Sequence, residues 1–315
     1  MRSDARWLRI AARWLLPLAL LWTALPAGAV LIETGDGTGN TSAPPACPAM
    51  PVCDPGWDHV GVTANHNTVV YLRNRWVITA NHVTPNSVIL GGSTYGLLVG
   101  SEIRLDNGDG TYPDLQIFGL TTDPGLPELP IRSLAVSASD LVIMIGGGRD
   151  RGAATDSDDP SIWQPPPDPP ETPIPGWLWA ATKSKRWGVN RITDLLDPDP
   201  LDTVSFFTTF DDPTAPAHVS DEAQAADGDS GGGAFVKQGN TWELAGILFA
   251  VGTYDGHLNN SALRGEATII ADLTHYRQQI LDLTASEPVP EPSGLAGLFA
   301  GLALLATLGR GRMRA

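Results

Sequence analysis

A serine in a glycine-rich segment is the first feature of this 315-residue chain that suits chemistry. The segment spans residues 228–233, reads GDSGGG and carries the serine at position 230. A serine hydroxyl is a poor nucleophile by itself, because it needs a base to take its proton and donors to hold the oxyanion that develops. Flanking glycines permit a tight turn, so we expect the backbone N–H groups of Gly228 and Ser230 to form an oxyanion hole.

A candidate base lies far upstream in the chain. The apolar, strand-like run WVIT at residues 76–79 leads through Ala80 and Asn81 to His82. A histidine that directly follows a strand is more often structural than catalytic when it stands alone. An imidazole within reach of a serine hydroxyl can, however, take the proton and later return it to a leaving group.

Taken together and in this order, the histidine and serine segments closely resemble those of the trypsin-like serine proteases, which have the chymotrypsin fold. The resemblance extends over roughly residues 58–284. It implies hydrolysis of peptide bonds in protein or peptide substrates through an acyl-enzyme, with His82 as base, Ser230 as nucleophile and no cofactor. It also implies that the strand at residues 244–249 pairs with the substrate backbone.

The resemblance further implies a carboxylate that orients the imidazole, and two aspartates qualify. Asp114 precedes the run 115–120, which alternates in the manner of the family's strand at this point. Asp140 precedes the run 141–146, but that run ends in a glycine-rich turn, like a later strand of the family. We assign Asp114 to the triad and keep Asp140 as the alternative.

The serine segment also fits the looser G-x-S-x-G turn of the α/β-hydrolases. Those enzymes carry serine, acid and histidine in that chain order, so His257 or His275 would have to be the base. They also need parallel strands that alternate with helices, and the sequence shows no such alternation. The order His82, Asp114, Ser230 favours the trypsin-like interpretation.

The chain departs from the trypsin-like pattern around the substrate pocket. Gln224 stands six residues before Ser230, where the family has the residue at the base of the pocket, so no buried carboxylate would attract Arg or Lys. We place Val251 on the pocket wall, which favours small or medium-sized apolar side chains. The expected specificity is therefore not tryptic.

A second departure concerns the acid just before the serine. In the family a freed apolar amino terminus pairs with this acid, which is Asp229 here. The chain has no Ile-Val-Gly-Gly sequence after a basic residue. Removal of a leader after Ala29 would expose Val30, which is one way to supply the ammonium group.

The elements that must position these residues are predicted to be strands. Short apolar runs separated by turn residues recur from His59 onward, which is typical of an all-β sandwich or barrel. The resemblance implies two antiparallel six-stranded β-barrels. A helix is predicted over residues 269–283 from apolar residues at helical spacing. The proline-rich residues 154–175 are predicted to form an exposed, irregular surface insertion.

The two ends resemble targeting signals, and they flank an irregular segment at residues 30–57 and a trypsin-like domain at residues 58–286. Residues 1–29 combine early arginines, a short apolar run and the small residues AGA, as in a secretory signal peptide that signal peptidase removes. A membrane-anchoring first helix is the alternative.

The carboxyl-terminal residues 287–315 contain the sequence VPEP, a short apolar helix that crosses a bilayer only marginally, and a basic tail. In that order these parts resemble the PEP-CTERM sorting signal of Gram-negative bacteria. The resemblance implies export across the inner membrane, membrane contact through the terminal segments only, and processing by an exosortase at the cell surface. An ordinary carboxyl-terminal anchor is the alternative.

Composition narrows the choice of partners. The formal net charge is −15, and nucleic-acid binding needs a basic surface, so a nucleic-acid partner is excluded. The two cysteines, Cys47 and Cys53, either form a short-loop disulfide outside the cytosol or remain free thiols. The histidines show no paired ligand spacing, and residues 106–110 lack the ligand pattern of a calcium loop, so no metal is expected.

The competing class of function is a catalytically inactive binding protein of the cell surface or extracellular matrix that keeps the protease fold. Because all three triad residue types occur in the family's order, we favour a secreted serine endopeptidase.

Overall fold

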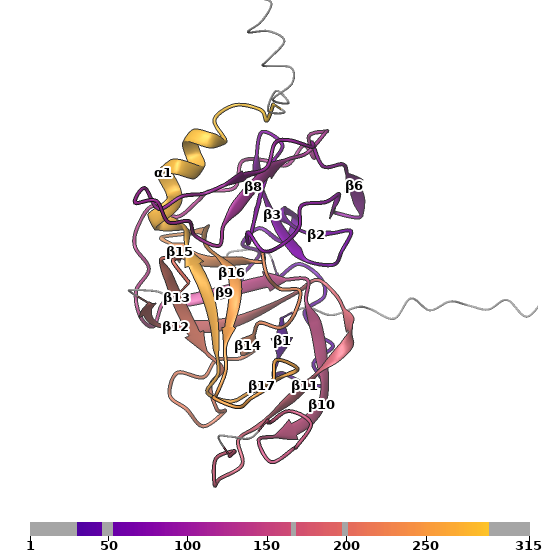
Figure 1. The fold of residues 1–315 in the computed structure, drawn as a ribbon, viewed down its shortest axis with the longest axis vertical. Helices are drawn as coiled ribbons and strands as arrows, with labels where there is room; N and C mark the ends of the chain where they lie inside the picture. Colours follow the sequence, from indigo (N-terminus) through magenta and orange to yellow (C-terminus); the bar gives the residue numbers. More distant parts are fainter. Residues whose placement is uncertain (1–29, 46–52, 165–167, 197–200, 290–315) are drawn as a thin grey trace, which may run out of the picture.

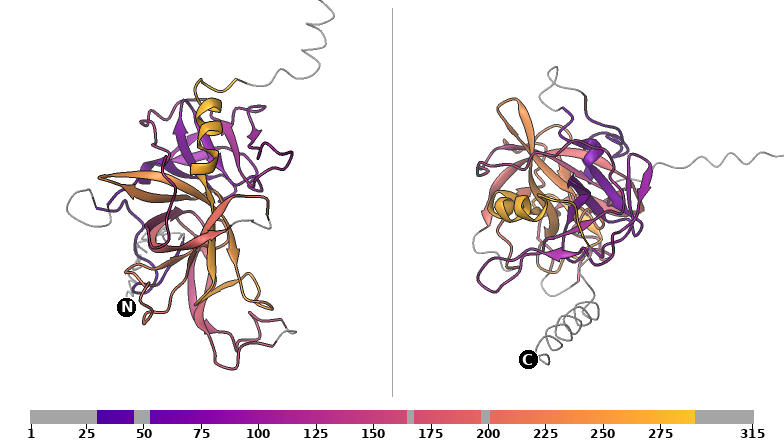
Figure 2. Two further views of the ribbon diagram at one scale, coloured as in Figure 1. Left: turned by 90° about the vertical axis from the view of Figure 1, so that its left-hand side faces the viewer. Right: turned by 90° about the horizontal axis from the view of Figure 1, so that it is seen from above.

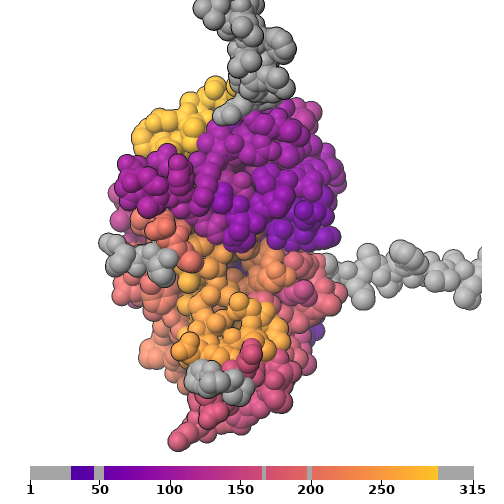
Figure 3. Space-filling model, viewed as in Figure 1, coloured from indigo at the N-terminus to yellow at the C-terminus, as the bar shows by residue number. Residues whose placement is uncertain are grey.

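A computed structural model describes residues 30–45, 53–164, 168–196 and 201–289. Its architecture is mostly β, with one α-helix among the described residues, which confirms the predicted fold class. Figure 1 shows an amino-terminal group of strands above a barrel, with the helix α1 (Leu273–Leu283) beside both. In the space-filling view the amino-terminal half forms the upper part of the molecule and the barrel the part below (Figure 3).

The amino-terminal half is a seven-stranded antiparallel sheet in the order β6-β5-β2-β3-β4-β8-β7. A short 3-10 helix, Trp57–His59, leads into it. Its strands are β2 (Val60–Thr63), β3 (Thr68–Arg73), β4 (Trp76–Thr79), β5 (Val88–Leu90), β6 (Ser93–Tyr95), β7 (Ile103–Arg104) and β8 (Gln116–Gly119). It has one strand more than the six expected, because Gly91 and Gly92, both at positive φ, make the tight turn that folds β6 back on β5.

The carboxyl-terminal half is a closed six-stranded barrel in the order β12-β13-β18-β16-β15-β9. Its strands are β9 (Leu141–Gly146), β12 (Arg186–Leu196), β13 (Ser205–Thr209), β15 (Gly233–Gln238), β16 (Thr241–Gly252) and β18 (Ala267–Asp272). β1 (Leu31–Ile32) and β14 (Ala223–Gln224) form a separate two-stranded antiparallel pair, and β14 precedes the serine segment in the sequence.

The two halves share their largest hydrophobic core. Ile78 and Ile117 of the sheet belong to the same buried cluster as Ile145, Phe235 and Leu244 of the barrel. Burial of apolar surface on both sides fixes the halves against each other. The junction between them is therefore a firm position for a site built from both.

The predicted helix begins later than its periodicity indicates. Ile269 lies in β18, and α1 starts only at Leu273. The side chain of Asp272 accepts a hydrogen bond from the backbone N–H of Thr274, and this cap sets the start of the helix.

The predicted irregular insertion at residues 154–175 is partly wrong. It is the far end of a long hairpin formed by β10 (Arg149–Asp156) and β11 (Pro175–Lys183), which β17 (Ser261–Leu263) completes to a three-stranded sheet. Pro175 is tolerated because it is the first residue of its strand. Between the strands, Ile162 and Trp163 are buried against Leu263, so this connection is not simply exposed. We call β10, β11 and β17 the arm; Figures 1 and 2 show it projecting from the barrel end farthest from the amino-terminal sheet.

Both expected targeting segments fall largely outside the described residues. Residues 1–29 and 290–315, which hold nearly all of the predicted leader and sorting signal, are not described. Within the described ranges, no helix is both long and apolar enough to cross a membrane.

Candidate active site

The serine segment is tied to the amino-terminal sheet by Thr68 of β3. The backbone N–H of Thr68 donates to the Ser230 carbonyl oxygen at 3.1 Å, and its hydroxyl donates to the Gly228 carbonyl oxygen at 2.8 Å. The same hydroxyl accepts from the Gly147 N–H at 2.8 Å. One buried side chain of the sheet therefore holds two loops of the barrel.

Close packing at Gly231 completes this attachment. Gly231 has φ +89°, and a Cβ there would overlap the Thr68 carbonyl oxygen and the Thr79 hydroxyl oxygen. Thr79 is the last residue of β4, and His82 follows three residues later. The segments that carry the proposed nucleophile and base therefore meet at the junction of the two halves.

Strand register brings the histidine and its acid together. Thr79 of β4 pairs with Gln116 of β8, so residues just after β4 lie beside residues just before β8. His82 Nδ1 lies 2.6 Å from Asp114 Oδ2, and the backbone N–H of His82 donates to Asp114 Oδ1 at 2.9 Å. Asp114 itself is positioned by the Thr203 hydroxyl, which accepts its backbone N–H at 2.9 Å.

The electrostatics of this pair favour an ionised carboxylate. Burial by itself would raise the pKa of Asp114, but the hydrogen bonds from His82 and its charge together hold that pKa below its ordinary value. Asp140, the alternative acid, accepts a hydrogen bond from the Ser137 backbone N–H and lies near Arg132. The structure thus brings Asp114, and not Asp140, to His82.

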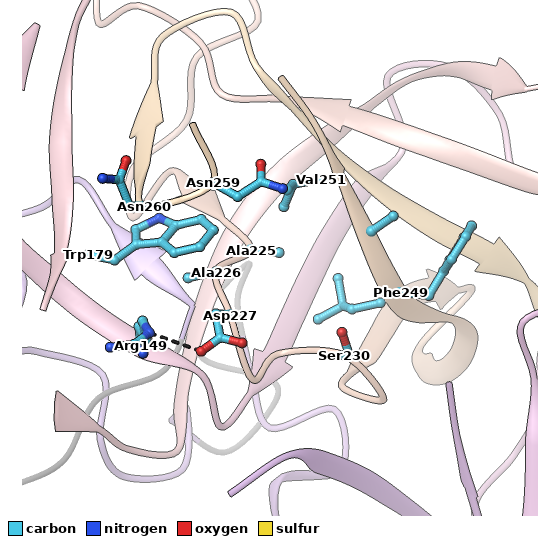
Figure 4. A pocket seen from close by; sticks show the side chains of 12 residues that line it. Arg149, Trp179, Ala225, Ala226, Asp227, Ser230, Phe249, Val251, Asn259 and Asn260 are labelled. Atoms are coloured by element: carbon cyan, nitrogen blue, oxygen red, sulfur yellow. Dashed lines mark hydrogen bonds and ion pairs between the residues drawn. The ribbon is translucent and has the colours of Figure 1, made fainter. Parts of the chain in front are cut away.

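Ser230 completes the constellation only in part. Its hydroxyl forms no hydrogen bond with the described residues, so the expected contact with His82 is not made in this structure. Figure 4 shows the hydroxyl at the edge of a pocket whose far wall carries Trp179. Hydrogen bonds between catalytic groups are often long without substrate and tighten when it binds.

Within the serine segment, residues 228–233, the N–H groups of Gly228 and Ser230 have no acceptor among the described residues. Each belongs to a peptide unit whose carbonyl oxygen is already bound. The Asp227 oxygen accepts from the Arg149 N–H at 2.9 Å, and the Asp229 oxygen accepts from the Gly232 N–H at 2.7 Å. Because a trans peptide directs N–H opposite to C=O, these bonds fix the direction of both free donors.

The pocket beside Ser230 has a volume of about 610 Å³ and an open mouth. Ala225, Ala226 and Val251 are among its lining residues, as Figure 4 shows. Gln224 is not. Its side chain is 1% exposed, its amide nitrogen donates to the Ala267 carbonyl oxygen, and its amide oxygen accepts from the Thr268 hydroxyl. Gln224 therefore supports the barrel and does not form the pocket base, because β14 turns it inward against β18.

The lining residues that were not anticipated from the sequence include Arg149, Trp179, Asn259 and Asn260. Arg149 and Trp179 belong to the arm, and the two asparagines precede β17. At the mouth of the pocket, Arg149 Nε lies 2.9 Å from the Asp227 carboxylate. The serine segment carries no local signal for these residues, because they depend on how a distant hairpin folds back.

Asp229 is completely buried below the serine segment. Its carboxylate accepts from the backbone N–H groups of Ala226 and Gly148 at 2.8 Å each, and from that of Val30 at 3.2 Å. Burial raises its pKa to about 6, against the effect of these hydrogen bonds. Val30 is 0% exposed, so the residue that follows the expected leader lies at the acid beside Ser230.

No family model matches this sequence, and no curated protein matches it. Among solved structures, human heparin binding protein superposes with a TM-score of 0.47 and 14% identity, over 75% of this chain and 95% of its own. Neuropsin, a serine protease expressed in the limbic system of mouse brain, gives 0.46 and 16%, over 73% and 96%. Kallikrein-related peptidase 10 gives 0.45 and 15%, over 74% and 98%. At these identities and TM-scores, the similarity gives no information about activity. Any statement about activity has to be argued from the geometry of the site.

The remaining predicted site residues concern cysteines and metals. Cys53 is buried and disulfide-bonded, and its sulfur accepts a hydrogen bond from Trp242 Nε1 at 3.0 Å. Cys47 lies outside the described residues. In the part of the chain that the structure describes, no group of three or more His, Cys, Asp or Glu side chains gathers as metal ligands would.

Proposed function

We propose that this chain is a serine endopeptidase with the triad His82, Asp114 and Ser230. The observation that carries the proposal is the His82–Asp114 pair, joined at 2.6 Å on the same junction to which Thr68 ties the serine segment. The two free N–H groups at Gly228 and Ser230 supply the donors that an oxyanion requires.

In the proposed reaction, Ser230 Oγ attacks the carbonyl carbon of the scissile bond while His82 Nε2 takes its proton. Asp114 keeps the other ring nitrogen protonated and stabilises the imidazolium that forms. The oxyanion then accepts hydrogen bonds from Gly228 and Ser230. As the tetrahedral intermediate collapses, the scissile C–N bond breaks and His82 gives its proton to the leaving amine, which leaves the acyl group on Ser230 Oγ. Water, deprotonated by His82, then attacks the acyl carbon, and the carboxylic acid departs as Ser230 regains its proton.

The proposed binding mode uses a free edge of the barrel. Beyond Ile247, β16 pairs with β15 no further, whereas its other edge stays paired to β18 as far as Gly252. An extended substrate can therefore add as a strand along residues 249–251. The side chain before the scissile bond would then enter the pocket walled by Ala225, Ala226 and Val251, which favours small or medium-sized apolar groups.

We further propose that the enzyme acts outside the inner membrane. This rests on the leader-like residues 1–29 and the PEP-CTERM-like residues 287–315, with signal peptidase and an exosortase as processing partners. The alternative, a protease-fold binding protein without activity, is an outcome of the experiment that follows.

A fluorophosphonate probe tests the proposal, because it reacts with a serine only when base and oxyanion donors activate it. We expect labelling of the wild-type protein, no labelling of Ser230→Ala, and unchanged labelling of Ser93→Ala, which alters an exposed serine on β6. A folded wild-type protein that takes up no probe would establish the binding-protein alternative.

A further inference from the structure

A second cavity lies on the other side of the serine segment. It has a volume of about 380 Å³ and opens to solvent. We call it the lysine pocket; its lining residues are Trp57, Val60, Gly61, Val62, His66, Ile89, Gly91, Gly92, Gly147, Lys183, Ser184 and Lys185. The amino-terminal half therefore supplies one wall, and Gly147 with residues 183–185, where β11 leads back to the barrel, supplies the other.

The charge of this cavity contrasts with that of the chain. The chain has 35 acidic residues and 20 Lys or Arg, yet no carboxylate is among the residues that line the lysine pocket. The whole sequence contains three lysines, Lys183, Lys185 and Lys237, and two of them line this one cavity. A concentration of cations in an acidic protein indicates a ligand of negative charge.

Lys183 stands between the two cavities. Its Nζ lies 3.2 Å from the Asp227 carboxylate at the mouth of the first pocket and 3.5 Å from the His66 carbonyl oxygen. A Cβ at Gly228 would be 2.6 Å from the same Nζ. Because Asp227 is shared between Lys183 and Arg149, this group of three keeps one positive charge beside the proposed oxyanion hole.

Lys185 lies deeper in the cavity. Its Nζ donates to the Trp57 carbonyl oxygen and stands 4.1 Å from the centre of the Trp57 ring. It forms no ion pair with a described residue, and burial lowers its pKa to about 8, although Asp58 and Asp54 act in the opposite direction. A half-buried ammonium group without a paired carboxylate gains the most when a ligand brings one.

We propose that the lysine pocket binds an acidic side chain of the substrate on the leaving-group side of the scissile bond. This inference rests on the proposed function. In a substrate strand that pairs with residues 249–251, the residues before the scissile bond lie along this edge of β16. The residues after the scissile bond therefore continue beyond Ser230, past Gly228 and toward Lys183. There the first or second residue after the scissile bond reaches Lys183 and Lys185.

Matched peptides test this. A sequence that the enzyme cleaves is prepared with Glu, Gln or Lys at each of the two positions after the scissile bond, with amidated ends, and kcat/KM is measured. We expect Glu to exceed Gln by about fivefold at one of these positions, as a partly exposed ion pair provides, and Lys to be the poorest. Raising the salt concentration should reduce the preference. Equal rates for Glu and Gln at both positions would overturn the inference.

Variants then assign the preference to this cavity. Lys183→Gln and Lys185→Gln should each reduce the ratio of Glu to Gln rates, whereas Lys237→Gln removes the third lysine, at an exposed position of β15, and should leave the ratio unchanged. A preference that survives the double variant Lys183→Gln, Lys185→Gln would contradict the assignment. The same peptides with a free carboxyl terminus are compared with the amidated ones. If the free terminus raises kcat/KM and Glu does not, the cavity recognises the end of a chain, and the inference that it binds an acidic side chain is overturned.

A substrate without residues after the scissile bond separates the two proposals. A peptide 4-nitroanilide reports acylation and hydrolysis alone. If it is hydrolysed and the peptide series shows no acidic preference, only the lysine pocket inference fails. If it is not hydrolysed and no peptide is cleaved, the proposed function fails and this inference fails with it.

Discussion

At the candidate active site, His82 and the carboxylate of Asp114 are joined by two hydrogen bonds. Asp114 accepts both the backbone N–H and the ring nitrogen of His82, so the ring orientation follows from the acid. An imidazole whose Nδ1 is held protonated by a carboxylate offers Nε2 as the base. Replacing Asp114 by an uncharged side chain of the same size should therefore lower the rate of the proposed reaction far more than it lowers the stability of the fold.

We predict that Asp114→Asn lowers kcat by about 10³-fold to 10⁴-fold, because the amide favours the wrong tautomer of the ring. Asp140→Asn is the matched control, since this carboxylate binds the Ser137 N–H away from His82 and its loss should leave kcat within a factor of two, about the size of a surface effect. Steady-state kinetics and thermal unfolding of both variants provide the measurement. An equal loss of activity in the two variants would contradict the assignment of Asp114.

At the scale of residues, the runs that follow Asp114 and Asp140 in the sequence were sufficient to predict that His82 pairs with Asp114 and not with Asp140. The structure joins His82 to Asp114, and it leaves the N–H groups of Gly228 and Ser230 without acceptors. Gln224 was placed by counting back from Ser230, and counting cannot reveal that β14 turns its side chain toward Ala267 and Thr268. Side-chain direction depends on strand pairing, which spans distant residues.

At the scale of elements, the attachment of the serine segment to β3 and β4 is the contact that assembles the site. It leaves no space for a side chain at Gly231, and the φ of +89° there also disfavours any residue with a Cβ. The two halves of the site would separate if this contact were forced apart.

We predict that Gly231→Ala lowers the free energy of unfolding by about 3 kcal/mol or more and abolishes probe labelling, because the new methyl group adds overlap to backbone strain. Gly239→Ala is the control. Gly239 also has positive φ, at +61°, but no atom lies within 4 Å of a Cβ there, so it should cost about 1 kcal/mol through strain alone and keep its activity. Urea unfolding measures both. Similar costs for the two variants would mean that the segment is not packed against the sheet.

Strand positions were predictable from alternating apolar runs and turn residues, and α1 from its periodicity. The start of that helix was not, because β18 continues to Asp272 and the same apolar residues satisfy both periods over that stretch. The arm was missed for a different reason. Its strands pair across a proline-rich connection, and proline signals outweighed the short strand pattern at either side.

At the scale of the whole molecule, the first residues that the structure describes lie inside the protein. Val30, Leu31 and Ile32 are buried, and the Val30 nitrogen lies 3.2 Å from the Asp229 carboxylate. The cleavage after Ala29 that the sequence predicts would convert an amide nitrogen into an ammonium group at this buried acid. A charge that pairs with a buried carboxylate contributes far more than a neutral N–H.

We predict that one alanine added before Val30 lowers kcat/KM at least about tenfold, because it keeps the nitrogen neutral and displaces the charge. An alanine added at the other end of the mature chain is the control and should have no effect. Full activity of the extended form would exclude a role for the Val30 ammonium group.

The mature chain that begins at Val30 and the form with one alanine added before Val30 should differ in how their free energy of unfolding depends on pH. With a neutral Val30 nitrogen, the pKa of Asp229 is raised to about 6, so its contribution to stability is fully present below pH 4 and is lost as the pH rises through 6. An ammonium group lowers that pKa and removes the loss. Urea unfolding from pH 4 to pH 7 should thus show a steeper decline for the extended protein; parallel curves would contradict the pairing.

The arm has a consequence for how this molecule can diversify. It contributes Trp179 and Arg149 to the wall and mouth of the first pocket, yet its three strands form a sheet separate from the barrel and from the residues that would perform the reaction. Exchanging Trp179 on the pocket wall should change the choice of cleaved bond while the proposed catalytic residues keep their places. Libraries randomised in this hairpin, with Arg149 and Lys183 kept because both bind Asp227 beside the proposed oxyanion donors, would sample new preferences at little risk to turnover.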